Sequence, residues 1–155
     1  MKEIVIAYYS RTGVTRKVAG QLAALLDADL EEIREAKDRS GLLGWLSAAM
    51  DSTLKREAEL TSVHNAEGRR TVVIGMPVWG FKPPPAVRSY LKKVNLAGKK
   101  VCAFCTFDGS GGDRTLDAVA DLVPGGLAAR LPLKKPAANP NLAAILKEWA
   151  KQVGG

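Results

Sequence analysis

The sequence has no apolar run near the roughly 18 residues that a membrane-spanning helix needs, so no membrane span is expected. It also leaves no room for a secretory signal peptide, because strand-like residues begin by Glu3, and a cytoplasmic location is the expectation. No repeat and no linker interrupt its 155 residues, of which 46% are hydrophobic. Disorder is therefore not expected, and a single domain over residues 1–155 is predicted.

Cysteine and histidine are scarce. Cys102 and Cys105 have the C-x-x-C spacing of redox and metal sites, but they lie in KKVCAFCTF, which is typical of a buried strand. Because residues three apart on a strand point to opposite faces, the two thiols are expected to stay apart in the core. His64 lies in a polar stretch and is expected in a loop. No metal site and no redox-active cysteine pair are predicted.

Acidic residues are too few to balance the basic ones, and the net charge is +7. Such an excess can indicate nucleic-acid binding. Here, however, the basic residues form isolated pairs at the expected ends of elements, with no interleaved aromatic residues. The pairs are Arg69 and Arg70, Lys92 and Lys93, Lys99 and Lys100, and Lys134 and Lys135. A solvated basic surface is therefore predicted, with no nucleic-acid partner.

Strand-like and helix-like segments alternate along the chain. Runs rich in Val and Ile indicate buried strands, and two weaker segments suit sheet edges. The predicted strands are 3–9, 70–76 and 100–107, with 28–33 and 126–133 as the weaker pair. Helical spacing of apolar residues predicts helices at 14–26, 83–94, 112–123 and 141–153. This alternation predicts an α/β fold in which helices cover both faces of a parallel sheet.

Residues 38–60 do not fit this alternation. GLLGWLSAAMDSTL predicts an additional amphipathic helix whose broad apolar face includes Trp45, with Ser40 as its candidate N-cap. The simplest interpretation is that this helix covers the sheet in place of a regular crossover helix. A lid over a ligand and a contact in a homodimer are the alternatives.

Three turns of unusual composition follow strands of the predicted sheet. They read SRTGVT after the first strand, PVWGFKPPP after the third and TFDGSGGDR after the fourth. In a parallel sheet the turns after the strands meet at one edge, and ligands bind there where the strand order reverses. The three turns therefore predict a ligand site at the carboxyl edge.

The first turn combines the hydroxyls of Ser10, Thr12 and Thr15 with Gly13, ahead of a helix N-terminus. The unpaired N–H groups and the dipole of such a terminus favour an anion, and Arg11 can add a charge-assisted contact. One hydroxyl would be enough for a helix cap, so three favour phosphate binding over capping alone. The turn has neither the G-x-x-x-x-G-K-[ST] nor the G-x-G-x-x-G pattern of other nucleotide-binding loops.

The other two turns offer an aromatic shelf and a glycine-rich polar loop. Trp79 is either a core residue or, if it faces outward, a platform for a planar ring. In the third turn, glycines around Asp108 let backbone N–H groups approach a ligand edge. A phosphate loop, an aromatic shelf and a glycine loop on one edge together predict a site for a flat heterocycle that carries one phosphate.

On these residues the sequence resembles the flavodoxin family. SRTGVT matches the family's S/T-x-T-G-x-T phosphate loop, while GMPVW and CTFDGSGG resemble the two loops that hold the isoalloxazine ring. The resemblance covers nearly the whole chain. It implies a three-layer sandwich around a five-stranded parallel sheet of order 2-1-3-4-5, of which flavodoxin is the usual example, and non-covalently bound FMN.

The resemblance assigns cofactor-binding roles to three sets of residues. The FMN phosphate would be enclosed by Ser10, Arg11, Thr12, Gly13, Val14 and Thr15. One side of the flavin ring would be lined by Pro77, Val78, Trp79, Gly80 and Phe81. The other side and the pyrimidine edge would be bordered by Thr106, Phe107, Asp108, Gly109, Gly111 and Gly112. Whether Trp79 or Phe107 stacks on the ring stays open, and no side chain is an obvious catalytic acid or base.

Three functions remain open, and whether the chain is an enzyme is one of the open points. An electron carrier would pass electrons to a redox partner protein, here an acidic one because this chain is basic. An FMN reductase would instead take hydride from NAD(P)H and pass it to a quinone or similar small acceptor. A regulator that binds a phosphate or nucleotide without redox chemistry is the third. Arg11, Lys82 and Arg114 on the flavin-side loops are expected to raise the flavin potential.

Overall fold

The computed structural model describes residues 1–36, 60–61 and 66–155. His64 and the helix expected at 38–60, apart from its last residue, lie outside these described residues. Five strands form one parallel sheet of order β2-β1-β3-β4-β5, which confirms the order that the resemblance implied. The strands are β1 (Ile4–Tyr8), β2 (Asp29–Glu32), β3 (Thr71–Pro77), β4 (Lys100–Phe107) and β5 (Ala129–Lys134).

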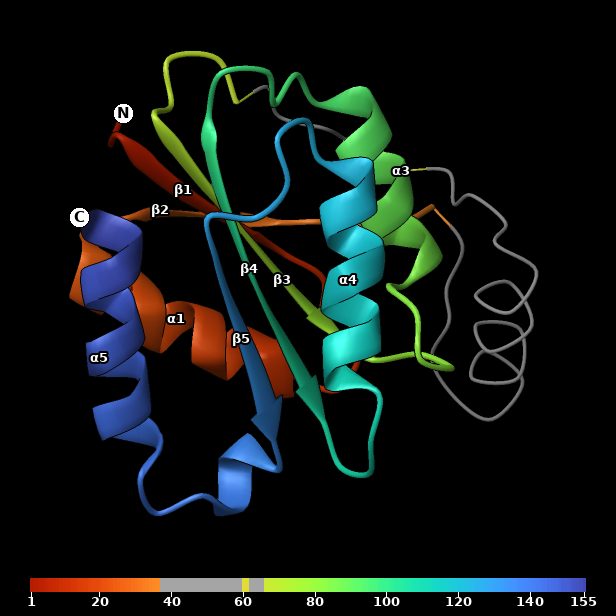
Figure 1. The fold of residues 1–155 in the computed structure, drawn as a ribbon, viewed down its shortest axis with the longest axis vertical. Coiled ribbons are helices and arrows are strands. Elements are labelled where there is room, and N and C mark those ends of the chain that lie inside the picture. The colour runs from red at the N-terminus through yellow and green to blue at the C-terminus, as the bar shows by residue number, and fades with distance from the viewer. Residues whose placement is uncertain (37–59, 62–65) are drawn as a thin grey trace.

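Helices cover both faces of this sheet (Figure 1). One face carries α1 (Val14–Leu26) and α5 (Leu142–Gly154), and the other carries α3 (Pro85–Lys93) and α4 (Gly112–Leu122). A short 3-10 helix, η1 (Pro136–Ala138), connects β5 to α5. The result is the three-layer α/β sandwich that the sequence predicts.

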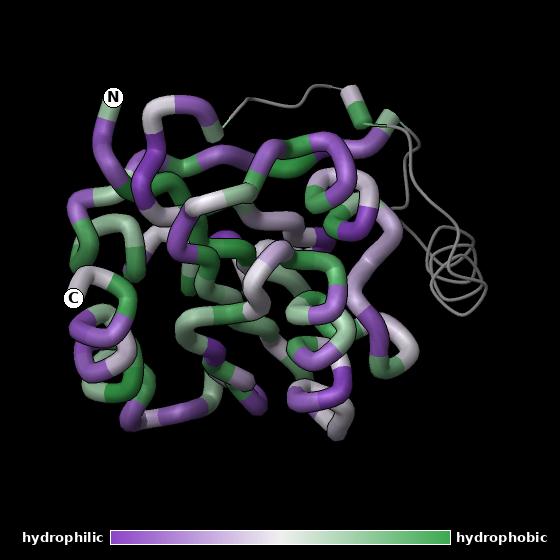
Figure 2. The backbone as a smooth tube through the Cα atoms, turned by 45° about the horizontal axis from the view of Figure 1, so that its top comes forward, coloured by the Kyte–Doolittle hydropathy of each residue, from purple (hydrophilic) through white to green (hydrophobic). Residues whose placement is uncertain are grey.

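The core consists of one apolar cluster on each face of the sheet. Hydrophobic and hydrophilic residues alternate along the covering helices, as expected for helices with one face on the sheet (Figure 2). Cys102 packs in the cluster under α1 and α5, whereas Cys105 packs in the cluster under α3 and α4. The predicted separation of the thiols is confirmed. Both cysteines are buried core residues, and this burial raises the pKa of the Cys105 thiol to about 12.

The strand order reverses between β1 and β3, since β2 lies beyond β1 on one side and β4 lies beyond β3 on the other. All strands run the same way, so the turns after β1, β3, β4 and β5 gather at one edge (Figure 1). This edge and this reversal point are where open α/β sheets bind ligands.

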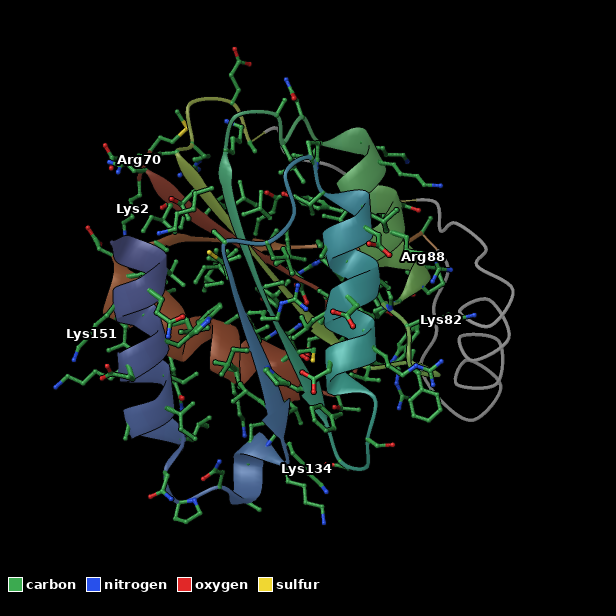
Figure 3. All side chains as sticks on the ribbon, in the orientation of Figure 1. Lys2, Arg70, Lys82, Arg88, Lys134 and Lys151 are labelled. Carbon is green, nitrogen blue, oxygen red and sulfur yellow. The ribbon has the colours of Figure 1, made fainter. Side chains whose placement is uncertain are left out.

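The basic residues are spread over the molecule. Lys2 and Arg70 lie close together, and Lys82, Lys134 and Lys151 lie at separate places around the periphery (Figure 3). This distribution agrees with the scattered basic surface expected from the sequence. In the described part of the chain, no helix has the length and apolar character required to cross a bilayer.

Candidate functional site

A cavity of about 240 Å³ opens at the carboxyl edge of the sheet, where the turns after β1, β3 and β4 meet. The first turn contributes Arg11, Thr12, Val14 and Thr15, the second Pro77, Val78 and Trp79, and the third Thr106, Phe107 and Asp108. Pro136 completes the lining. All of these residues except Pro136 are among those predicted from the sequence. The fold thus brings three distant segments to one cavity beside the β1/β3 reversal point.

The first turn keeps most of its hydrogen-bond donors for a ligand. Ser10 caps the turn itself, because its Oγ accepts hydrogen bonds from the backbone N–H groups of Gly13 at 3.1 Å and Arg16 at 3.3 Å. Gly13 has a φ of 96°, a conformation that favours glycine. Within the described residues, the N–H groups of Thr12, Val14 and Thr15 have no protein acceptor. One hydroxyl therefore caps the helix, and these N–H groups can bind an anion.

A buried pair of hydroxyls links the first turn to the end of β4, where the third turn begins. The Oγ1 atoms of Thr15 and Thr106 are 2.9 Å apart, and the two residues are only 2% and 5% exposed. In such a pair one hydroxyl donates to the other, which keeps its own hydrogen for a further acceptor. Both residues line the cavity, so the pair can offer one donor to a bound ligand.

The second turn fixes Trp79 at the cavity wall. Trp79 and Lys82 exchange two backbone hydrogen bonds of 3.1 Å around Gly80 and Phe81, whose φ values of 58° and 63° form a tight turn. The Trp79 ring meets the ring of Tyr9 edge to face, with centroids 5.3 Å apart. Trp79 is half-buried, packs against the core and still lines the cavity. It therefore combines the packing and the ligand-facing interpretations left open by the sequence.

Phe81 turns away from this cavity and packs on the third turn. A Cβ added to Gly111 would lie 2.2 Å from a ring carbon of Phe81, so only glycine leaves room for the ring there. The Arg114 guanidinium lies 5.3 Å from the centre of the same ring. In the same way, Phe107 lies against Gly112, where an added Cβ would be 2.5 Å from the ring. These two glycines make room for aromatic side chains.

Seven of the predicted residues do not line the cavity. They are Ser10, Gly13, Gly80, Phe81, Gly109, Gly111 and Gly112. Of the three basic residues placed on the flavin-side loops, Arg11 lines the cavity, whereas Lys82 and Arg114 line a separate one with Phe81. Arg11 is consequently the cation whose charge acts most directly on a ligand in the 240 Å³ cavity.

Sequence reasoning missed Pro136, which lines the cavity from the segment after β5. The neighbouring Lys135 donates its backbone N–H to the carbonyl of Phe107 at 2.7 Å, and this bond holds the segment against the third turn. The strand topology is the signal that could have identified Pro136. The turn after β5 ends at the same edge as the others, although its composition alone indicates no ligand.

The match to a known family agrees with this geometry. The sequence profile described as Flavodoxin matches residues 3–149. The chain belongs to the flavodoxin family. The comparison of this flavodoxin-family protein with curated proteins found no match.

Solved structures similar to this flavodoxin-family protein include several flavoproteins. A candidate flavoprotein from Bacteroides uniformis ATCC 8492 is 25% identical, with 96% of this chain and 97% of that chain covered and a TM-score of 0.82. A flavoprotein from Lactobacillus acidophilus NCFM, solved in complex with FMN, is 18% identical over 97% and 99% of the chains, with a TM-score of 0.72. An NADH:FMN oxidoreductase in its apo form is 14% identical over 99% and 89%, with a TM-score of 0.62. The last two show the shared fold.

Proposed function

We propose that this chain binds FMN non-covalently in the 240 Å³ cavity and serves as a flavodoxin-like electron-transfer protein. The observation that carries the proposal is the meeting of the three predicted turns at one cavity beside the β1/β3 reversal point. Membership of the flavodoxin family and the FMN complex of a structural neighbour support it.

The residues present fit this cofactor. Donors of the first turn, namely the N–H groups of Thr12, Val14 and Thr15, would bind the phosphate, and Arg11 would add a charge-assisted contact. Trp79 offers an aromatic wall for the ring, and Asp108 offers an acceptor at the cavity edge. Bound FMN would supply the redox chemistry, while the protein orients it and tunes its potential.

The partner of the carrier is expected to be an acidic protein. The chain has a net charge of +7, and electrostatic complementarity guides and accelerates docking between proteins. A basic partner would be repelled. The rate of electron transfer to an acidic acceptor protein should therefore fall as the salt concentration rises, because salt screens exposed charges. A rate that is independent of salt would contradict this expectation.

Absorbance after incubation with FMN and desalting tests the cofactor. The purified protein should retain bands near roughly 370 and 450 nm, a property of the bound oxidised flavin. Thr12→Ala removes a hydroxyl from the cavity lining and should weaken FMN by about tenfold, the effect of losing about 1.5 kcal/mol. Ser110→Ala, in the third turn but outside the lining, is the matched control and should change nothing. A colourless wild-type protein would refute the proposal.

The second candidate is an NAD(P)H-dependent FMN reductase that acts on a quinone or similar small acceptor. The similarity to a solved NADH:FMN oxidoreductase supports it. Rapid mixing of FMN-loaded protein with NADH or NADPH alone separates the candidates. Fast bleaching of the flavin would support the reductase, whereas slow or absent bleaching would leave the carrier.

A further inference from the structure

A hollow of about 330 Å³ lies between the second turn and α4, and it shares no lining residue with the 240 Å³ cavity. The second turn contributes Phe81 and Lys82 to its walls, α3 contributes Arg88, and α4 contributes Arg114, Asp121 and Leu122. Figure 3 shows Lys82 and Arg88 on the same side of the molecule. We call this surface the Phe81–Arg114 patch.

The ring of Phe81 is the apolar centre of the patch. Phe81 is 46% exposed, and its φ of 63° is a left-handed conformation that bulky residues rarely adopt. Its ring packs on Gly111 and lies 5.3 Å from the Arg114 guanidinium. An exposed aromatic ring beside an arginine is the combination that is enriched at the centres of protein–protein interfaces.

The charge of the patch favours an acidic partner. Of the described residues that line the hollow, Lys82, Arg88 and Arg114 are basic and Asp121 is the one acidic residue. The Nη1 atom of Arg88 donates a hydrogen bond to the Pro83 carbonyl at 2.7 Å, which fixes this side chain beside the second turn. Arg114 is exposed and forms no ion pair with any described residue. Carboxylates on a partner protein would complement this surface.

The patch is joined to the candidate FMN site by the two turns that lie between them. Trp79 lines the 240 Å³ cavity, and Phe81, two residues later, lines the patch. Backbone hydrogen bonds between Trp79 and Lys82 close this turn. Phe81 packs on Gly111 of the third turn, which also places Asp108 at the cavity. A protein that covers Phe81 would therefore lie beside both turns of the flavin site.

We propose that the Phe81–Arg114 patch is the docking surface for an acidic electron-acceptor protein. The proposal rests on the proposed function, because the electron comes from FMN bound in the 240 Å³ cavity. In this step the reduced flavin loses one electron, the metal centre of the acceptor gains it, and any proton that the flavin releases passes to water. A small patch suits the transient interfaces of redox proteins, which bury less than about 1,200 Å².

Stopped-flow mixing of dithionite-reduced, FMN-loaded protein with two oxidised acceptors tests this assignment. Rubredoxin is a small acidic iron protein, and cytochrome c is a basic haem protein. Reduction of rubredoxin should slow as the salt concentration rises. Arg114→Glu should slow rubredoxin reduction by about tenfold at low salt and accelerate cytochrome c reduction. Because a change in flavin potential would move both rates in the same direction, opposite changes identify an effect on docking.

Two further variants complete the test. Lys147→Glu makes the same change in net charge at an exposed position of α5, which covers the other face of the sheet (Figure 1). As the matched control, it should change either rate by less than about twofold, because salt and distance screen its charge. Phe81→Ala leaves the net charge unaltered and should slow rubredoxin reduction by about fivefold at every salt concentration, because it removes the apolar centre of the patch.

The outcomes separate this inference from the function beneath it. Equal slowing of rubredoxin reduction in Arg114→Glu and Lys147→Glu, slowing of both acceptors in Arg114→Glu, or an unchanged rate in Phe81→Ala would overturn the docking proposal and leave electron transfer intact. If the wild-type protein retains FMN but reduces neither acceptor, the electron-transfer function falls and the docking proposal falls with it. If the wild-type protein retains no FMN, the cofactor proposal is refuted as well.

Discussion

Substitution of Gly111 by alanine should break the junction between the second and third turns. Gly111 has a φ of 98°, and an added Cβ would lie 2.2 Å from Cδ1 of Phe81. An L-residue in a left-handed conformation costs about 1–2 kcal/mol. The Phe81 ring is 46% exposed and can shift, so the close contact adds about 1 kcal/mol, the low end of overpacking costs. Gly111→Ala should therefore lower the free energy of unfolding by about 2–3 kcal/mol, if the two costs add.

Urea denaturation of the apoprotein measures this effect, with Gly109→Ala as the matched control. Gly109 belongs to the same turn, has no positive φ, and has no atom within 4 Å of an added Cβ. Its substitution should stay within about 0.5 kcal/mol of wild type. Combining Gly111→Ala with Phe81→Ala should remove the overpacking part and leave only the backbone strain.

Two results would refute this reasoning. If Gly111→Ala and Gly109→Ala have the same effect, the left-handed backbone and the contact with Phe81 carry no energetic weight. If Gly111→Ala costs as much without the Phe81 ring as with it, the strain is real but the close contact is not its cause. The FMN affinity of Gly111→Ala, compared with that of the wild type, then shows whether the position of Trp79 depends on the contact between Phe81 and Gly111.

Three further predictions follow from buried and paired groups. Thr15→Val and Thr106→Val should each lower the free energy of unfolding by about 1–3 kcal/mol, because each leaves the other buried hydroxyl unpaired. The double variant should cost less than the sum of the two single variants, and additive costs would contradict the pairing. A thiol reagent at about pH 8 should label Cys102 and Cys105 only after unfolding, since burial raises the pKa of both thiols, and immediate labelling of either would be inconsistent with this. The hydrogen bond from Arg69 holds the pKa of Asp29 below its usual 3.8. The ionised Asp29 carboxylate therefore stabilises the fold at pH values above 3.8, and this stabilisation is lost as the pH falls through the lowered pKa. Asp29→Asn should therefore lose less stability than wild type between about pH 5 and pH 2 in urea titrations, and identical pH profiles would argue against the contribution.

The sequence alone determined the sheet and the location of the site. Continuous Val- and Ile-rich runs specify buried parallel strands, since both faces of such strands need apolar cover. Parallel strands then place the turns after them at one edge, so SRTGVT and the turns that contain Trp79 and Asp108 were expected at the same edge. The separation of Cys102 and Cys105 followed from the two-residue period of a strand. These features depend only on the spacing of apolar residues along each segment and on the common direction of the strands.

Only the tertiary structure decided which side chains line the cavity and which support it. Phe81 fits over Gly111 because the second turn closes in a tight hairpin beside the third, an arrangement that no local pattern encodes. Thr15 and Thr106 form a hydrogen bond across 91 positions of the chain, and Pro136 reaches the cavity because Lys135 binds the carbonyl of Phe107. Contacts of this kind depend on the relative placement of distant segments, which is set by packing of the whole sheet and its helices.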